Sequence, residues 1–426
     1  MAKKNSTIYL CNSCGNEFSV WAGRCSACGE WNSLVEIKNT MVNSINQSSA
    51  EVTSLTDIVL SNDYRIATGL SEFDRVLGGG LVPGSVILLG GEPGVGKSTL
   101  ILQVADKVKS TLYVSAEEST SQIKLRADRL KISGEMKLAS EANIESVLST
   151  VSKIKPDLLI IDSIQTVFTN TYNSTPGSLV QVRECGMILQ QYAKANNIPI
   201  IIIGHVTKEG NLAGPRILEH LVDVVLYLEG DRFTDARILR GTKNRFGATN
   251  EVGIFSMQEE GMIEISNPSE MFLSESKTSP GSCITATLEG TRPILIEIQA
   301  LAMPTHFGYP KRTSSGFDLN RLNLLAAVIS KKTDMNLSNY DIYLNVIGGI
   351  KLSEPAVDLA VCAAIISSFT NKSLPKGVCV FGEVGLLGEV RKVTRHKDRS
   401  KEAISLGYKT LENVISITEI SKLLVT

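Results

Sequence analysis

The chain has 426 residues, of which 43% are hydrophobic and 20% are charged, and its formal net charge is −1 at pH 7. This length predicts two or three domains, each with its own hydrophobic core. The near-zero net charge excludes a generally basic nucleic-acid-binding protein, so any contact with nucleic acid must come from local patches. No apolar run approaches the ~20 residues that span a bilayer, and the polar N-terminus has no signal segment. We therefore expect a cytoplasmic protein without a membrane partner.

Two closely spaced cysteine pairs lie near the N-terminus, Cys11 with Cys14 and Cys25 with Cys28, with ten residues between the pairs. Each pair places two thiolates on one tight turn. Four thiolates complete a tetrahedral site and leave no open position for a substrate, which predicts a structural zinc ion. We therefore expect residues 1–38 to form a four-Cys zinc module.

The composition of the next two zones predicts a linker and then an α/β domain. Residues 39–62 are rich in Ser and Asn, which is typical of a linker, with one short helical stretch near Leu55–Val59. In residues 63–267, short apolar β-branched runs alternate with amphipathic helical stretches. This alternation predicts a doubly wound, mostly parallel sheet covered by helices on both faces. The expected strands are Val86–Leu89, Thr111–Ser115, Leu158–Asp162, Ile198–Gly204, Val222–Leu228 and Ala236–Gly241.

The run LLGGEPGVGKST follows the first of these strands and leads into a predicted helix. Its glycines let consecutive backbone N–H groups point at phosphate oxygens, Lys97 can reach the β- and γ-phosphates, and the Ser98 hydroxyl can ligate Mg²⁺. The N-terminus of the following helix also favours an anion. The sequence therefore predicts a nucleoside triphosphate site. The expected contact residues are Gly91, Glu92, Pro93, Gly94, Val95, Gly96, Lys97, Ser98 and Thr99.

Carboxylates at the ends of two later strands are candidates for hydrolysis. Asp162 ends an apolar strand and is predicted to hold Mg²⁺ together with Ser98. Glu117 and Glu118 end the preceding strand, close to the expected place of the γ-phosphate. We favour Glu117 as the base that orients the attacking water, with Glu118 as the second choice. The other glutamate of the pair is then a favourable charge at a helix N-terminus.

Two further polar groups follow predicted strands. His205 stands at the tip of the strand Ile198–Gly204 and is predicted to sense the γ-phosphate, with a purely structural histidine as the alternative. Lys243 and Arg245 lie between glycines at the end of the last strand. Two cations there suit the triphosphate of an adjacent subunit or a nucleic-acid phosphate, and a solvated charged turn is the alternative.

Taken together, these motifs resemble the RadA/Sms family of bacterial recombination and repair proteins over nearly the whole chain. The most specific of them is the pentapeptide KNRFG at Lys243–Gly247, which distinguishes the family from RecA. Ala116 is one departure, because the family pattern YVSGEES has glycine there, and we expect no effect on chemistry. The other matching segments are the four-Cys module followed by Trp31-Asn32, RIATGLSEFDRVLGGGLVPGS before GEPGVGKST, YVSAEES, IGHVTKEGNLAGPRILEHLVD and VIGGIKLSEPAVDLA.

The resemblance implies a RecA-like ATPase core followed by a Lon-protease-like C-terminal domain, assembled as a homo-hexameric ring around single-stranded DNA. It implies a DNA-dependent motor that drives branch migration of recombination intermediates alongside RecA. It places Lys243 and Arg245 at the neighbouring subunit's ATP and makes the loop Thr207–Arg216 a DNA-contacting segment. The expected DNA-binding residues are Lys208, Arg216, Lys243, Arg245 and Arg312.

Residues 268–426, the expected Lon-like α+β domain, lack a complete protease dyad. A Lon-type protease needs a serine that a lysine activates. Aligning Pro355 with the proline of the Lon GPSAG motif puts Ala356 at the nucleophile and Lys397 at the lysine position, while Ser353 stands three positions early. We therefore expect a scaffold rather than a peptidase. Its basic residues form either a DNA path or only a solvated face. They are Lys311, Arg312, Arg321, Arg391 and Arg395.

We therefore predict an ATP-hydrolysing DNA motor of recombination that uses ATP, Mg²⁺ and Zn²⁺. Two rival classes stay open. An ATP-dependent peptidase is disfavoured by Ala356. A signalling ATPase of the circadian-clock type acts without DNA, but such proteins usually carry duplicated RecA-like halves, whereas this chain has a single phosphate loop.

Overall fold

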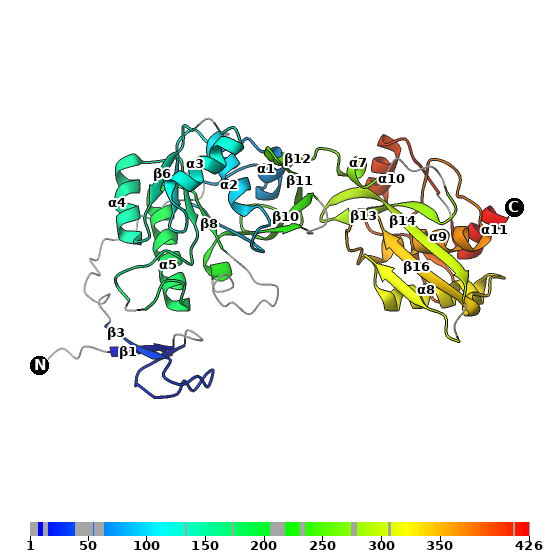
Figure 1. The fold of residues 1–426 in the computed structure, drawn as a ribbon, viewed down its shortest axis with the longest axis horizontal. Helices are drawn as coiled ribbons and strands as arrows, with labels where there is room; N and C mark the ends of the chain where they lie inside the picture. The colour runs from blue at the N-terminus through cyan, green and yellow to red at the C-terminus, as the bar shows by residue number, and fades with distance from the viewer. Residues whose placement is uncertain are drawn as a thin grey trace, which may run out of the picture. The chain divides into compact units, whose positions relative to one another are not determined.

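The computed structural model describes residues 7–11, 16–38, 54, 64–132, 134–172, 174–204, 218–230, 235–273, 279–305, 308–411 and 414–425 (Figure 1). These residues form two compact units. The first comprises the described residues through Gly230 and those of Asp235–Glu264, and the second begins at Ile265. Among the described helices, none combines the length and the hydropathy needed to span a bilayer. The predicted helical stretch Leu55–Val59 lies outside the described residues.

The N-terminal module is a three-stranded antiparallel sheet in the order β2-β1-β3. Its strands are β1 (Thr7–Cys11), β2 (Glu17–Phe18) and β3 (Leu34–Lys38). The buried core of the module consists of Cys11, Cys25 and Leu34, with Tyr9 and Phe18 packed against it. So small a core is typical of modules that rely on a metal ion or disulfides for stability.

The rest of the first unit is built on a nine-stranded sheet in the order β12-β11-β10-β9-β4-β8-β7-β5-β6. The strands from β9 to β6 pair in parallel, and β10, β11 and β12 continue the sheet as an antiparallel meander. The strands are β4 (Val86–Gly91), β5 (Thr111–Ser115), β6 (Lys137–Ser140), β7 (Leu158–Asp162), β8 (Ile200–Ile203), β9 (Val224–Gly230), β10 (Ala236–Asn244), β11 (Val252–Gln258) and β12 (Gly261–Glu264).

This topology confirms the predicted doubly wound, mostly parallel α/β sheet. Each of the six predicted strands is present, but the fourth and the fifth begin at Ile200 and Val224, each two residues later than predicted. Strands β6, β11 and β12 were not predicted from the sequence. The helices of this unit include α1 (Ser71–Leu77), α2 (Lys97–Lys107), α3 (Thr120–Arg129), α4 (Ile144–Ile154) and α5 (Leu179–Asn196), and residues 218–221 are also helical.

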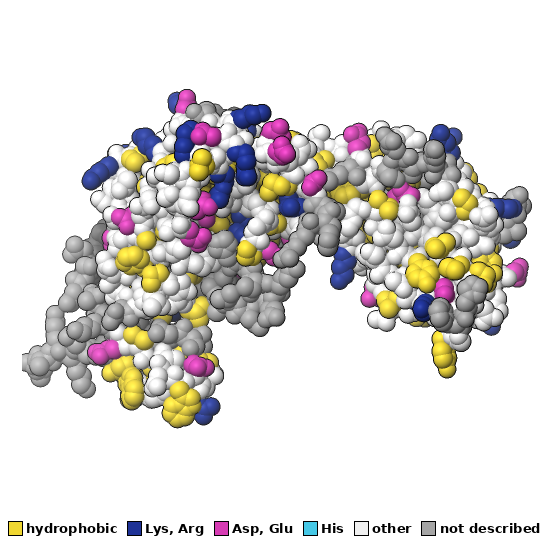
Figure 2. All heavy atoms as spheres, viewed as in Figure 1, with side chains coloured by type: hydrophobic (Ala, Val, Ile, Leu, Met, Phe, Trp, Pro, Cys, Tyr) yellow, Lys and Arg dark blue, Asp and Glu magenta, His cyan; other side chains and the backbone are white. Residues whose placement is uncertain are grey.

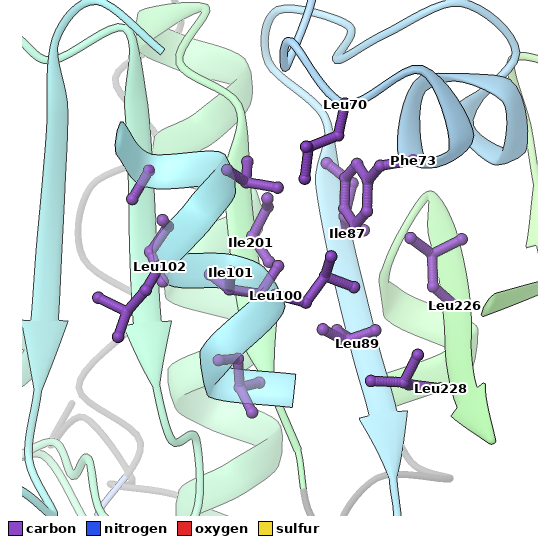
Figure 3. Packing of buried hydrophobic residues seen from close by; sticks show 14 of the residues in the cluster. Leu70, Phe73, Ile87, Leu89, Leu100, Ile101, Leu102, Ile201, Leu226 and Leu228 are labelled. Atoms are coloured by element: carbon purple, nitrogen blue, oxygen red, sulfur yellow. The ribbon is translucent and has the colours of Figure 1, made fainter. Parts of the chain in front are cut away.

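Helices pack on both faces of the sheet because its central strands are apolar on both sides. In β4, Ile87 and Leu89 belong to one core with α1, α2 and α3, whereas Val86 and Leu88 belong to a second core with α4 and α5. Figure 3 shows the first core, in which Leu100 of α2 lies close to Ile87 and Leu89 of β4. Burying such aliphatic side chains contributes about 1.5–3 kcal/mol each. The phosphate loop therefore joins a strand and a helix that the core holds firmly.

The second unit is an α+β fold on a six-stranded sheet in the order β15-β16-β14-β13-β17-β20, with a separate β18-β19 pair. Its strands are β13 (Ser282–Glu289), β14 (Arg292–Pro304), β15 (Arg312–Ser315), β16 (Tyr340–Val346), β17 (Val378–Cys379), β18 (Glu383–Val384), β19 (Val390–Arg391) and β20 (Lys409–Thr410). Its helices are α7 (Pro268–Phe272), α8 (Leu319–Lys332), α9 (Asp358–Thr370), α10 (His396–Ser405) and α11 (Ile417–Val425). The expected Lon-like relationship of this unit stays a prediction.

A buried ion pair joins three segments of the second unit. The Arg399 guanidinium, with 0% of its side chain exposed, forms a two-pronged pair with Glu354, with Nη1···Oε1 2.8 Å and Nη2···Oε2 2.6 Å. Arg399 Nη1 also donates to Ala286 O at 2.5 Å, and Glu354 Oε1 accepts from Thr287 Oγ1 and Leu288 N, both at 2.7 Å. The pair therefore fastens α10 and β13 to the turn before α9.

Burial alone raises the pKa of the Glu354 carboxyl, but the hydrogen bonds and charge of Arg399 outweigh it and hold this pKa below its ordinary value of 4.5. A carboxylate with a lowered pKa in the folded state stabilises the fold above its unfolded pKa. That contribution is lost as the pH falls through the folded pKa.

We expect Arg399→Met to lower the free energy of unfolding by about 3 kcal/mol at pH 7, because it leaves a partly buried carboxylate without its partner. The loss should shrink as the pH falls from the unfolded-state pKa of about 4.5 through the lower pKa of the folded state, where Glu354 becomes protonated. Urea denaturation followed at pH 7 and pH 4 measures both effects. The control Lys401→Met changes an exposed cation on the same helix. Equal losses in the two variants would contradict the role of the pair.

Candidate functional site

The phosphate loop lies between β4 and α2 and depends on glycine. Gly91, Gly94 and Gly96 have φ angles of 152°, 80° and 109°, a region that other residues rarely adopt. A Cβ atom on Gly96 would lie 2.4 Å from the methyl carbons of both Met257 and Met262. Gly96 is also the N-cap of α2, so the free amide groups of the first turn face the loop.

Lys97 is the first residue of α2 and is 4% exposed. Its Nζ donates to Gly91 O at 2.9 Å and to Glu92 O at 3.0 Å. Burial lowers the pKa of Lys97 to about 8, and the negative charges of Asp162 and Glu117 oppose this shift. A bound triphosphate would bring further negative charge and favour the ammonium form. The loop therefore presents a partly desolvated cation to its ligand.

Asp162 and Tyr113 meet because β5 and β7 are neighbouring parallel strands, which pair Ser115 with Asp162. The Tyr113 hydroxyl donates to Asp162 Oδ2, and both side chains are buried. Burial, together with the charge of Asp162, raises the pKa of Tyr113, so the phenol stays a neutral donor. Tyr113 thus orients the carboxylate that the sequence assigns to Mg²⁺. The sequence analysis did not assign Tyr113, because only the strand order reveals this contact.

The structure separates the two glutamates that follow β5. Glu117 accepts a hydrogen bond from the buried Ser163 hydroxyl, next to Asp162. Glu118 instead forms an ion pair with Arg126 of α3. Glu117 therefore faces the end of β7 and the field of Lys97, whereas Glu118 is held by the helix. This arrangement supports Glu117 as the water-orienting base, which stays a prediction.

A pocket of about 690 Å³ opens against the phosphate loop. Its volume lies within the range of sites that hold small molecules, about 300–1,000 Å³. Five predicted contact residues line it, together with residues of α3 and of the β11–β12 hairpin that the sequence analysis did not assign. The lining residues are Gly94, Gly96, Lys97, Ser98, Thr99, Arg126, Arg129, Met257, Gln258, Glu259 and Gly261.

Lys243 and Arg245 come from the end of β10 and contact the C-terminal end of the helical residues 218–221 and the residues just after it. Lys243 Nζ donates to Glu219 O and Val222 O, both at 2.7 Å, and Arg245 pairs with Asp223 at 3.3 Å. Burial and the charge of Arg245 lower the pKa of Lys243. Both cations therefore bind acceptors of their own chain, and their expected contact with a neighbouring nucleotide stays a prediction. Three other predicted residues lie outside the described part of the chain: His205, Lys208 and Arg216.

Three of the four predicted zinc ligands come together in the N-terminal module. The sulfur atoms of Cys11, Cys25 and Cys28 all lie within 4.8 Å of one another, and those of Cys11 and Cys28 are 3.7 Å apart. A tetrahedral site with Zn–S distances of about 2.3 Å has sulfur–sulfur edges of about 3.8 Å. The described thiols therefore fit zinc. Cys14 lies outside the described residues.

Two of the basic residues predicted on the second unit, Arg312 and Arg321, bind acceptors within that unit. Arg312 donates to Leu337 O at 3.0 Å and to Tyr340 O, and its burial lowers its pKa. Arg321 pairs with the buried Asp358. Over the face of the protein in Figure 2, Lys and Arg side chains are interspersed with Asp and Glu. The expected DNA path over this unit stays a prediction.

Comparison with known proteins agrees with the metal module. A family model described as a rubredoxin metal binding domain matches residues 9–36, and a family of unknown function (DUF7125) matches residues 65–254. The crystal structure of the RadB recombinase aligns with 47% of this chain and 99% of its own chain, at a TM-score of 0.39 and 21% identity.

Two relatives match almost the whole chain. The DNA repair protein RadA of Bacillus subtilis is 51% identical over 425 residues, which cover 96% of this chain and 93% of that protein. The DNA repair protein RadA of Listeria monocytogenes is 48% identical over 423 residues, with the same coverage. Such identity over the full length confirms the resemblance inferred from the motifs. The chain belongs to the family of the DNA repair protein RadA.

Proposed function

We propose that the chain hydrolyses ATP at the phosphate loop and couples hydrolysis to movement on DNA during recombination and repair. The observation that carries this proposal is the position of Lys97. Its ammonium group lies under a glycine-dependent loop and within the electrostatic field of Asp162 and Glu117. This combination of loop, cation and carboxylates is the one that phosphoryl transfer requires.

The oxygens at the site fit Mg²⁺. Asp162 is a nearly buried carboxylate that Tyr113 orients, and Ser98 lines the pocket beside Lys97. Magnesium prefers oxygen ligands and keeps several waters, so Ser98 would bind it directly and Asp162 through water. When bound, Mg²⁺ neutralises charge on the β- and γ-phosphates.

The side chains of this chain do the remaining work. Backbone amides of the loop and the first turn of α2 bind the phosphates, and Lys97 Nζ balances the charge that develops between the β- and γ-phosphates. Glu117, held by the Ser163 hydroxyl, accepts a hydrogen bond from water and directs that water to the γ-phosphate. Glu118 stays paired with Arg126 and does not take part in the reaction.

The role in DNA repair rests on the relatives, which carry that name. We extend the proposal to a homo-hexameric ring on single-stranded DNA that promotes branch migration together with RecA. In such a ring Lys243 and Arg245 reach the neighbour's nucleotide, the loop containing Lys208 and Arg216 contacts DNA, and His205 senses the γ-phosphate. The contact of Arg312 with DNA is the least supported, because its guanidinium already binds three carbonyl oxygens of its own unit.

Nothing in the described residues favours a peptidase. Ala356 is buried and offers no hydroxyl, and Lys397 is exposed on α10. The turn that precedes Ala356 instead carries Glu354, which the buried Arg399 holds. A serine–lysine dyad needs a nucleophile at that place. The second unit is therefore proposed as a scaffold of the ring.

We expect Lys97→Ala to reduce ATP turnover at least 100-fold, because a preorganised cation that stabilises transition-state charge is worth about that much. Turnover is measured with and without single-stranded DNA, at low and moderate salt. The matched control Lys109→Ala removes an exposed lysine just after α2 and should keep the wild-type rate. Wild-type turnover in Lys97→Ala would refute the site. DNA that leaves the wild-type rate unchanged would refute the motor.

We expect the purified protein to hold one zinc ion per chain and Cys25→Ser to lose it, because a tetrahedral site needs every thiolate. Zinc content is measured by release to a coloured chelator after denaturation. Cys185→Ala, which changes a buried cysteine of α5, should keep the metal. Full zinc content in Cys25→Ser would contradict the assignment.

A further inference from the structure

The phosphate loop binds a ligand through its N–H groups, and the carbonyl groups of the same loop also need partners. A buried carbonyl oxygen without a donor costs free energy comparable to a lost hydrogen bond. At the start of the loop, Lys97 Nζ donates to Gly91 O and Glu92 O. Val95 lies further along the loop and is 7% exposed, and its carbonyl group is bound by a different part of the fold.

The donor for the Val95 carbonyl is Arg237 of β10, which lies 142 positions further along the chain. Arg237 Nε donates to Val95 O at 3.1 Å, and Arg237 Nη1 donates to Ala236 O at 2.8 Å. Strand pairing places Arg237 opposite Gly230 of β9. A Cβ atom on Gly230 would lie 2.4 Å from Arg237 Cδ and 2.7 Å from Arg237 Nε. Glycine at this position therefore leaves the space through which the guanidinium reaches the loop.

The hydrogen bond from Arg237 fixes the direction of the next amide group in the loop. The peptide that joins Val95 to Gly96 is trans, and in a trans peptide the C=O and the following N–H point in opposite directions. Because Val95 O points at Arg237, the Gly96 N–H points away from it. Gly96 lines the pocket beside the loop, whereas Arg237 is not among the lining residues. The bond therefore keeps this amide turned away from β10, on the side that a phosphate can reach.

The glycine that follows Val95 makes this restraint important. Gly96 has a φ angle of 109°, and a residue without a Cβ atom adopts many other backbone conformations at little cost. The peptide before it can therefore rotate and turn its N–H group away from a ligand. Lys97 does not prevent this rotation, because its ammonium group binds the other end of the loop.

We infer that Arg237 is a positioning residue of the phosphate loop, which holds the peptide between Val95 and Gly96 in the orientation that binds phosphate. The inference rests on the proposed function, because it concerns the same loop. Arg237 acts through the loop backbone and not by touching the nucleotide. Without its guanidinium the loop samples other orientations, so the binding of a phosphate must also order the loop, which lowers the affinity.

The test compares Arg237→Met with the wild-type full-length protein. Methionine keeps much of the aliphatic stem and removes the hydrogen bond to Val95. Affinities for ATP and inorganic triphosphate are measured with Mg²⁺ by displacement of a fluorescent ATP analogue. Both should fall by the same factor of about ten, as expected for one hydrogen bond from a charged group. The KM for ATP should rise by a similar factor with kcat unchanged, because the loop binds the phosphates in the ground state and the transition state alike.

The matched control is Arg240→Met. Arg240 lies on the same strand and pairs with Glu229 of β9 at 2.8 Å, so the control removes the same charge and also a contact with β9. It should keep the wild-type affinities and KM. Gly230→Ala is an independent second variant, because its Cβ would take the space of the Arg237 stem, and it should reproduce the loss of affinity.

Three results would overturn the inference. The first is an unchanged affinity for both ligands in Arg237→Met. The second is a weaker affinity for ATP alone, which would place the effect at the nucleoside and not at the phosphates. The third is a lower kcat with an unchanged KM, which a merely structural role produces by reducing the fraction of folded protein.

If Arg237→Met does not fold, Arg237→Gln takes its place with the same expectations. If the wild-type protein binds neither ATP nor inorganic triphosphate, the proposed function itself fails. Wild-type binding of both ligands with no change in Arg237→Met would instead leave the proposed function intact and remove only the role of Arg237.

Discussion

Lys97 Nζ lies among the carbonyl oxygens of Gly91 and Glu92, where β4 turns into α2. A buried ammonium group must find acceptors, and at this turn the backbone of a tightly curled loop supplies them. The curl in turn requires residues that tolerate positive φ, and the sheet must hold β4 and α2 in register. The position of Lys97 therefore depends on the strand order of the first unit, on its two cores and on the glycines of the loop.

The same sheet brings the acidic groups to Lys97. Because β7 lies beside both β5 and β8, the end of β7 meets the end of β5 at the edge that also bears the phosphate loop. Tyr113 and Ser163 then hold Asp162 and Glu117 by one hydrogen bond each. Side chains from segments far apart in the sequence are thus oriented before a ligand arrives, which is what preorganised electrostatic catalysis requires.

Local patterns in the sequence predicted much of this. Long apolar runs predicted six strands, the loop motif predicted the phosphate site, and cysteine spacing predicted the metal module. The short edge strand β6, whose residues are only partly buried or exposed, has no apolar run and was missed. The contact of Tyr113 with Asp162 depends on strand order, and the pairing of Glu118 with Arg126 depends on how α3 begins. The pocket wall formed by the β11–β12 turn is a tertiary contact that no local pattern encodes.

The pair of Glu354 and Arg399 has a consequence for how the chain is made. The two residues are 45 positions apart, and Arg399 also binds Ala286, which lies 113 positions before it. On the ribosome, Ala286 and Glu354 emerge while their common partner is still unsynthesised. The second unit therefore cannot complete this pair until Arg399 has been translated, whereas the first unit, whose residues end at Glu264, can fold earlier.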